Sequence, residues 1–192
     1  GAAGGDDGLE AAAARYYGAA HLLPVAGMAV ASHLVPTLLP RAVVACIGPL
    51  DEAHLAAWAQ AGQRPRLLNN VPLARALAAA TPYVLLARPN GISAACVTRS
   101  AAVDAAEQLK KRGGWLIVDE SLGDATPDES LAPLAGSAAA PNLIVLRSLD
   151  HFFGLPGARV AFICAAPEQL AKLAPAAALW AVASPCRAAA RL

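Results

Sequence analysis

Three chemically active side chains lie close together in the segment RSLDHFFGLPGARVAF, residues 147–162. Ser148 offers a hydroxyl group and Arg159 a guanidinium group, and this pair suits a dianionic phosphate. His151 lies between them and carries an imidazole, which can accept a proton near neutral pH. The segment therefore predicts an anion site beside a candidate base. A lone arginine on a strand is more often a surface ion-pair residue, and that interpretation stays open.

Two other positions offer chemistry that suits the same kind of site. Asp119 follows the apolar run Trp115–Val118, and ligands of open α/β sheets bind at such strand ends. The turn that contains Gly27, Met28 and Ala29 precedes a predicted helix, whose free N–H groups suit a phosphate. Each position also has a plainer interpretation, because Asp119 suits a cap or turn and Gly27 suits an ordinary strand–helix turn.

Strand-like and helical segments alternate along the chain, and they must position these side chains. The predicted strands are His21–Val25, Val43–Ile47, Arg66–Asn69, Tyr83–Ala87, Trp115–Val118, Leu143–Leu146 and Arg159–Ile163. The predicted helices are Leu9–Tyr17, Met28–Leu39, Glu52–Ala61, Leu73–Ala80, Arg99–Arg112 and one that begins with Pro167–Leu173. This alternation favours an α/β fold with a mostly parallel, doubly wound sheet. The Pro-, Ser- and Ala-rich tract Gly123–Ala140 is predicted to be a long surface connection.

Composition excludes several classes of function. The chain has 192 residues, of which 57% are hydrophobic, and this suits a buried sheet covered by alanine-rich helices. A net charge of +1 gives no reason to expect a nucleic-acid or membrane-surface partner. No apolar run reaches the roughly 18 residues that a membrane span needs.

The cysteines indicate a reducing compartment. Cys46, Cys96, Cys164 and Cys186 lie far apart and form no C-x-x-C pair, so they are interpreted as core thiols of a cytoplasmic protein. The acidic residues and the histidine around the candidate site also have no recognised metal-ligand spacing, and no metal site is predicted.

The motifs together resemble one enzyme family. RSLDHFFGLPGARVAF resembles the cofactor-anchoring segment of the aminotransferases that use pyridoxal phosphate (PLP), of fold type I. WLIVDESLGDATP, residues 115–127, resembles the strand that carries the aspartate of the pyridine nitrogen. DDGLEAAAARYYG (residues 6–18) and HLLPVAGM (residues 21–28) resemble the threonine-phosphate decarboxylase-like proteins of cobalamin synthesis and the histidinol-phosphate aminotransferases.

The resemblance implies a fold, a cofactor site and partners. The expected fold is a three-layer α/β/α domain with a mostly parallel seven-stranded sheet. Asp119 would pair with the ring nitrogen of PLP, which makes the cofactor an electron sink. The phosphate of PLP would be bound by Gly27, Met28, Ala29, Ser148 and Arg159. The family further implies a phosphorylated amino acid as substrate and a homodimer that builds its active site between two subunits.

Four positions depart from the family pattern. The lysine that holds PLP as a Schiff base is replaced by His151, and imidazole cannot form that bond with a carbonyl. The position of the ring-stacking aromatic residue corresponds to Asp51. The asparagine that contacts the ring hydroxyl corresponds to Gly91, and a tyrosine near the Asp-Glu pair corresponds to Leu122. These losses predict that PLP is held weakly or not at all.

Three functions are compatible with this pattern. The first is an aminotransferase-like or threonine-phosphate decarboxylase-like protein of cobalamin or amino-acid biosynthesis, catalytically impaired because the cofactor lysine is missing. The second is a non-catalytic pseudoenzyme or binding subunit that keeps a phosphate site. The third is a lyase that uses pyridoxamine phosphate (PMP) with His151 as its base. His151 also has a second interpretation, as a residue that drifted after catalysis was lost, and this is the alternative to its role as a base in the third function.

The resemblance also sets an expected domain organisation. Residues 1–192 are expected to form the large, cofactor-binding domain of the family. The N-terminal segment and the C-terminal small domain of the family, which carries a substrate-binding arginine, have no counterpart in the sequence given.

Overall fold

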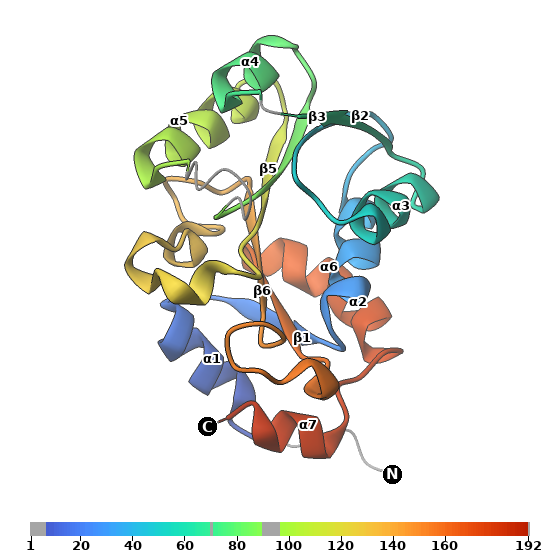
Figure 1. Cartoon of the computed structure of the whole chain (residues 1–192), viewed down its shortest axis with the longest axis vertical. Coiled ribbons are helices and arrows are strands. Elements are labelled where there is room, and N and C mark those ends of the chain that lie inside the picture. The colour runs from blue at the N-terminus through green and yellow to red at the C-terminus, as the bar shows by residue number, and fades with distance from the viewer. Residues whose placement is uncertain (1–6, 70, 90–96, 192) are drawn as a thin grey trace.

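Seven strands form one sheet in the order β1-β7-β6-β5-β4-β2-β3 (Figure 1). The computed structural model describes residues 7–69, 71–89 and 97–191. The strands are β1 (Leu22–Val25), β2 (Val43–Ile47), β3 (Arg64–Leu68), β4 (Tyr83–Ala87), β5 (Trp115–Asp119), β6 (Leu143–Ser148) and β7 (Ala161–Cys164). Five of them, from β3 to β6 in this order, pair in parallel, and β7 runs antiparallel between β6 and β1. The predicted mostly parallel seven-stranded α/β sheet is therefore confirmed.

Helices connect the strands and cover both sides of the sheet. The α-helices are α1 (Leu9–Tyr17), α2 (Met28–Leu34), α3 (Glu52–Gln60), α4 (Leu73–Ala78), α5 (Arg99–Lys110), α6 (Pro167–Ala178) and α7 (Ser184–Ala189). Short 3₁₀ turns are η1 (Val35–Leu38), η2 (Gly123–Ala125), η3 (Pro127–Glu129), η4 (Ala132–Leu134) and η5 (Pro156–Ala158). Local sequence explains several helix starts. The Asp51 carboxylate and the Thr98 hydroxyl accept backbone hydrogen bonds at the starts of α3 and α5.

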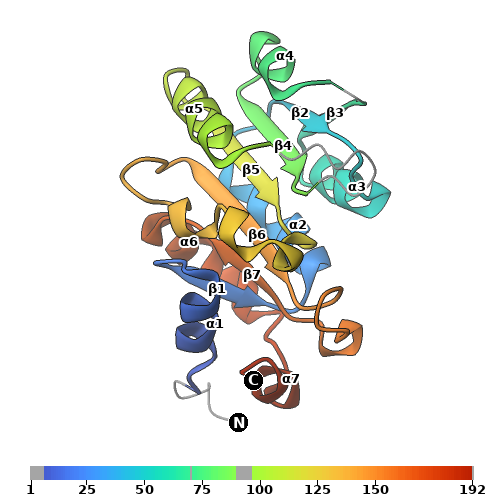
Figure 2. The ribbon, with the colours of Figure 1, turned by 60° about the vertical axis from the view of Figure 1, so that its left-hand side comes forward.

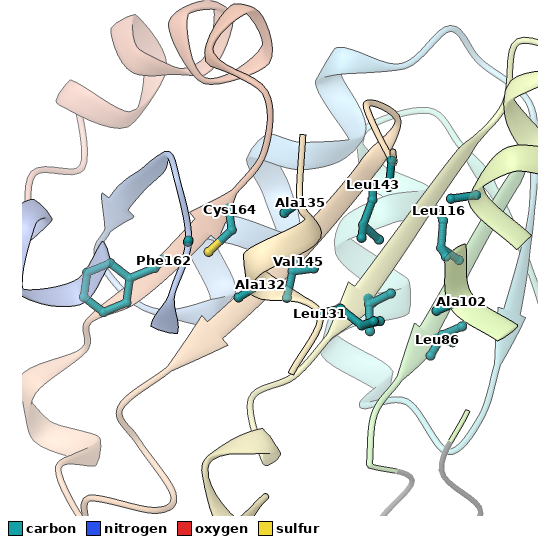
Figure 3. Close-up of a cluster of buried hydrophobic side chains, with 14 of the residues drawn as sticks. Leu86, Ala102, Leu116, Leu131, Ala132, Ala135, Leu143, Val145, Phe162 and Cys164 are labelled. Atoms are coloured by element: carbon teal, nitrogen blue, oxygen red, sulfur yellow. The ribbon is translucent and has the colours of Figure 1, made fainter. Parts of the chain in front are cut away.

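Each face of the sheet has its own hydrophobic core. On the first face, α1, α4, α5 and residues 131–140 pack on the sheet, and Figure 3 shows Leu131 and Val145 in this cluster. On the second face, α2, α3 and α6 cover the sheet, with Trp58 fully buried. Figure 2 shows the sheet between the two layers of helices. The expected three-layer arrangement is present.

Several boundaries differ from the predicted ones. The predicted strand Arg159–Ile163 is wrong at its start: Arg159 has a φ of 46° and ends the turn η5, so β7 begins only at Ala161. The predicted helix Met28–Leu39 changes into the 3₁₀ turn η1, where Pro36 removes a backbone donor. Helix α7 was not predicted, and β6 is longer than its apolar run, since it includes Ser148.

The tract Gly123–Ala140 is not simply a surface connection, as was predicted. It folds into η2, η3 and η4 and buries Leu131, Ala132, Ala135 and Ala140 against the first face of the sheet. Its apolar residues are isolated among Pro, Ser and Gly, so they show no strand or helix period that could reveal this packing. Across the part of the chain that the structure describes, no helix is long and apolar enough to cross a membrane.

Candidate functional site

The candidate residues meet at one edge of the sheet, where the parallel strands end. Asp119 pairs with Leu146 between β5 and β6, and Ser148 pairs with Ala161 between β6 and β7. Ala161 in turn pairs with Val25, the last residue of β1. Adjacent strands lie about 4.8 Å apart and rise about 3.3 Å per residue. Asp119 and Ser148 are therefore within about 10 Å of each other by this geometry.

Strand alternation separates the polar side chains at this edge into two groups. Along β5, Leu116 and Val118 belong to the core of the first face, whereas Ile117 belongs to the core of the second. Successive side chains of a strand point to opposite faces. Asp119 therefore lies on the second face with α2 and α3, and Glu120 lies on the first. By the same argument, Ser148 lies on the second face and Arg147 on the first.

Asp119 has a buried histidine as its partner. The Nδ1 atom of His54, on α3, lies 3.4 Å from Oδ2 of Asp119, and the side chains are 5% and 13% exposed. Burial by itself would raise the pKa of the Asp119 carboxyl. The interaction with His54 and the hydrogen bond from the Ser121 N–H outweigh burial and hold this pKa below its ordinary value of 3.8. The Asp119 side chain is thus a carboxylate at neutral pH, on the ligand-binding edge of the sheet.

The predicted phosphate-binding turn and Arg159 line a common cavity. This cavity has a volume of about 310 Å³, and its described lining residues are Ala26, Gly27, Met28, Ala29, Asp150 and Arg159. Gly27 has a φ of 92°, and a Cβ atom there would contact the Arg159 backbone at 3.7 Å. The Gly27 N–H donates to the Val25 carbonyl and the Val30 N–H donates to the Gly27 carbonyl. The N–H groups of Met28 and Ala29, in the first turn of α2, have no described acceptor. The cavity thus combines backbone donors with one guanidinium group.

A larger, mostly apolar cavity adjoins the first. Its volume is about 660 Å³, and it shares Ala26, Ala29 and Arg159 with the smaller cavity. Val30 and Leu34 of α2 line it on one side, and residues 180–183 and Cys186 line it on another. Trp180 is 62% exposed at this point. The apolar lining offers packing for a ligand or a protein segment, and His33 is the basic side chain that it adds to Arg159 among the described lining residues.

Ser148 and His151 are not among the described residues that line the smaller cavity. Ser148 is fully buried, and its hydroxyl accepts a hydrogen bond from the Asp150 N–H at 3.1 Å. His151 is exposed on the loop that follows β6, and its carbonyl accepts from the Gly154 N–H. The structure thus brings the Gly27–Ala29 turn and Arg159 together. Ser148 fixes the adjoining loop, and the His151 side chain lies in solvent.

On the first face, the same edge is closed by a buried ion-pair network. Glu120 is 0% exposed and accepts from Arg88 of the neighbouring β4 end at 3.2 Å and from Arg147 of β6 at 3.0 Å. Arg147 also binds Asp124 at 2.6 Å, and its guanidinium group lies 4.6 Å from the centre of the Tyr17 ring. These opposite charges neutralise one another inside the protein.

The glycine at position 123 is required by this network. A Cβ atom there would collide with the Nη1 atom of Arg147, so any other residue would force the buried guanidinium group to move. Arg147, which is 1% exposed and binds Glu120 and Asp124, is therefore a structural residue in this chain.

Two of the three other departures from the family pattern lie in described residues. Asp51 is exposed and caps helix α3 by accepting the Ala53 N–H at 3.0 Å. Leu122 is 42% exposed in the loop after β5. Gly91, which corresponds to the asparagine of the ring hydroxyl, lies outside the described residues. The Asp51 carboxylate offers no aromatic face on which a pyridine ring could stack.

Sequence reasoning missed His54 as a member of the site. His54, Ala57 and Trp58 form the buried side of α3, spaced three and four residues apart. That spacing would have indicated a histidine that needs a buried partner. It would not have identified Asp119 as that partner, because the two residues are 65 positions apart and meet only in the fold.

Solved structures with the same fold define the class of protein. The structure of histidinol-phosphate aminotransferase from Sinorhizobium meliloti in complex with pyridoxal-5'-phosphate superimposes with a TM-score of 0.81 at 22% identity. The superposition covers 95% of this chain and 53% of the aminotransferase chain. The fold is that of the large domain of PLP-dependent aminotransferases.

Sequence comparisons identify the family. The family described as "Aminotransferase class I and II" matches residues 67–191, more than half of the chain. The chain is 37% identical over 182 residues to threonine-phosphate decarboxylase of Pseudomonas aeruginosa, covering 95% of the chain and 54% of that protein. A threonine-phosphate decarboxylase of a Sinorhizobium species is 35% identical, with 93% and 53% covered. The chain belongs to the class I and II aminotransferase family, which is PLP-dependent, and spans about half the length of these curated relatives.

Proposed function

We propose that this chain is a threonine-phosphate decarboxylase-like or aminotransferase-like domain that holds PLP or PMP weakly, without a covalent bond, and is catalytically impaired by itself. The observation that carries this proposal is the buried Asp119–His54 pair at the same sheet edge as the Arg159 cavity. Arg159 precedes β7, which lies two strand spacings, about 10 Å, from β5. A ligand with a cationic ring nitrogen at one end and a phosphate at the other suits this arrangement.

The groups that would hold the ring nitrogen and the phosphate of the cofactor are present, but the lysine that would bind it covalently is missing. The Asp119 carboxylate suits a protonated ring nitrogen, and the N–H groups with Arg159 suit a phosphate. No lysine stands where the covalent bond would form, because His151 occupies that position. Lys110, Lys111 and Lys172, the lysines of the sequence, are all exposed on helices α5 and α6 or directly after α5.

The remaining groups define what the bound cofactor could do. PLP supplies an electron sink when its ring nitrogen is protonated, and Asp119 would hold the proton at that nitrogen. His54 orients the carboxylate through its Nδ1 atom. The substrate class is a phosphorylated amino acid, by analogy with relatives named for threonine phosphate and histidinol phosphate.

The non-catalytic alternative is favoured over a PMP-dependent lyase by one observation. A base must reach the proton that it abstracts, whereas the side chain of His151 is exposed and is not among the described residues of the cavity. A binding subunit that keeps the phosphate contacts needs no base. The homodimer and the cytoplasmic location stay predictions.

Titration of the purified chain with PLP and with PMP, followed by absorbance and calorimetry, tests the proposal. We expect non-covalent binding that weakens about tenfold or more in Asp119→Asn and in Arg159→Ala, since each removes a charge-assisted contact. Arg75→Ala, which removes an exposed arginine from α4, is the matched control and should bind like the wild type. Borohydride reduction and mass spectrometry should detect no lysine adduct in the wild type but some in His151→Lys.

Two results would contradict the proposal. If Asp119→Asn binds PLP as the wild type does, the ring-nitrogen assignment is wrong. A borohydride-stable lysine adduct in the wild type, or turnover of an amino acid by the wild-type chain, would mean that catalysis is intact.

A further inference from the structure

The small cavity beside Arg159 contains a carboxylate as well as a guanidinium group. Among its described lining residues, Arg159 and Asp150 are the charged ones. Asp150 is half-buried, and its Oδ1 atom is buried without a hydrogen-bond partner. The two side chains form no ion pair within 4 Å of each other among the described contacts, so the Asp150 charge is not neutralised by Arg159.

Among the ion pairs of the described residues, none includes Asp150. Arg147, three residues earlier, is 1% exposed and already binds Glu120 and Asp124 on the opposite face of the sheet. A phosphate in the cavity would therefore meet one positive and one negative side chain. Like charges at short range repel strongly where water is partly excluded, so the repulsion from Asp150 opposes the attraction of Arg159.

We propose that Asp150 is a specificity-determining residue that weakens the binding of dianionic phosphate in this cavity. The inference rests on the proposed function of the cavity as a phosphate site. It differs from the loss of the cofactor lysine, because it acts on the phosphate end of a ligand and not on its ring. The cavity discriminates against dianions and in favour of phosphate groups with a lower negative charge.

The loop geometry allows the charge to be removed without disturbing the backbone. The N–H of residue 150 donates to the Ser148 hydroxyl, and this bond does not involve the Asp150 side chain. Because Oδ1 has no partner, Asp150→Asn breaks no hydrogen bond of that atom. Asp150→Ser removes the same charge with a smaller side chain and serves as the second variant.

The test is calorimetric titration with inorganic phosphate at about pH 8 and low ionic strength. We expect Asp150→Asn and Asp150→Ser to bind phosphate about tenfold or more tightly than the wild type, and added salt should reduce the difference. Asp104→Asn removes an equal charge from the exposed side of α5 and should leave the affinity unchanged. Arg159→Ala in the Asp150→Asn background should abolish the gain.

Equal phosphate affinity in the wild type and both Asp150 variants would overturn the inference, and so would the absence of binding in all three. An equal gain in Asp104→Asn would also overturn it, because the effect would then come from net charge. The proposed function is judged separately by PLP binding to Asp119→Asn, whose substitution lies on β5 and does not line this cavity.

Discussion

The two faces of the sheet use charged residues in opposite ways at the same edge. On the first face, Glu120 is shared by two arginines and is completely buried. On the second face, Asp119 has one histidine partner at 3.4 Å. A cavity at the same sheet edge is lined by the exposed Arg159 and by Asp150, whose Oδ1 atom has no partner. Charges that share several ionic partners serve the fold, whereas charges with few or no ionic partners are available to a ligand.

This difference teaches that neighbouring residues of one strand can have unrelated roles. Asp119 and Glu120 are adjacent and have the same chemical group. Strand alternation alone places one in the structural network and the other in the candidate site. Four predictions test this division, beginning with the largest expected effect.

Removing the centre of the network should have the largest effect on folding. Glu120→Ala leaves Arg88 and Arg147 buried without their shared carboxylate, and we expect the free energy of unfolding to fall by about 3–5 kcal/mol. Urea denaturation followed by circular dichroism measures this change. Glu129 also pairs with Arg88, but the Glu129 side chain is 57% exposed. Glu129→Ala should therefore lower the free energy of unfolding by at most about 1 kcal/mol. Similar losses in both variants would refute the distinction between buried and exposed pairs.

Removing the partner of Asp119 should have a smaller effect. His54→Ala leaves a mostly buried carboxylate with only Ser121 as a described partner, and we expect a loss of about 1–3 kcal/mol in the free energy of unfolding. The same denaturation experiment measures it. The double variant His54→Ala, Asp119→Asn should recover part of the loss, because it removes the unpaired charge. If the double variant is less stable than His54→Ala, the pairing is not the reason for the loss.

Substitution of Gly27, in the backbone that lines the cavity, should have the next largest effect on stability. Gly27 adopts a φ of 92° and a ψ of 170°, a backbone conformation that an L-residue reaches only at a cost of about 1–3 kcal/mol. Gly27→Ala should lower the free energy of unfolding by this amount and also weaken phosphate binding. Gly157→Ala is the matched control, since a Cβ there meets no atom within 4 Å and its φ is not positive. Equal stability of the two variants would show that the conformation of Gly27 is not constrained.

The smallest effect concerns the acid limb of the stability profile. The pKa of Asp119 is below its ordinary value of 3.8 in the folded protein, so its contribution is present above that value. The contribution is lost as pH falls through the folded pKa. The stability difference between the wild type and Asp119→Asn should therefore shrink below about pH 4. Urea midpoints between pH 6 and pH 3 measure this, and a difference that grows on acidification would mean that the pKa is raised.

Much of the fold followed from periodicity in the sequence. Helix α1 and strands β2 and β4 have the predicted bounds, because apolar runs and helical spacing report burial directly. Pro36 and the left-handed residue Arg159 changed other boundaries, since local backbone chemistry overrides an apolar pattern. The packing of residues 131–140 under the first face depends on contacts distant in sequence, which no local pattern contains.

The candidate site was predictable in part. The strand-end position of Asp119 and the turn at Gly27 are visible in the sequence, and the structure places both at the same sheet edge. The partnership of Asp119 with His54 and the presence of Asp150 in the cavity depend on which loops meet, so they required the fold. Whether the site binds PLP stays a prediction.

The pairing of β1 with β7 has a consequence for synthesis of the protein. Within the sheet β1 pairs only with β7, and Val25 meets Ala161, 136 residues later. During synthesis β1 must therefore wait for β7, which at about 5–20 residues per second takes on the order of 10 seconds. Contacts between residues so distant in sequence carry a high entropic cost of loop closure and therefore form late. The cavity between Gly27 and Arg159 is thus assembled only once Arg159 and β7 have been synthesised.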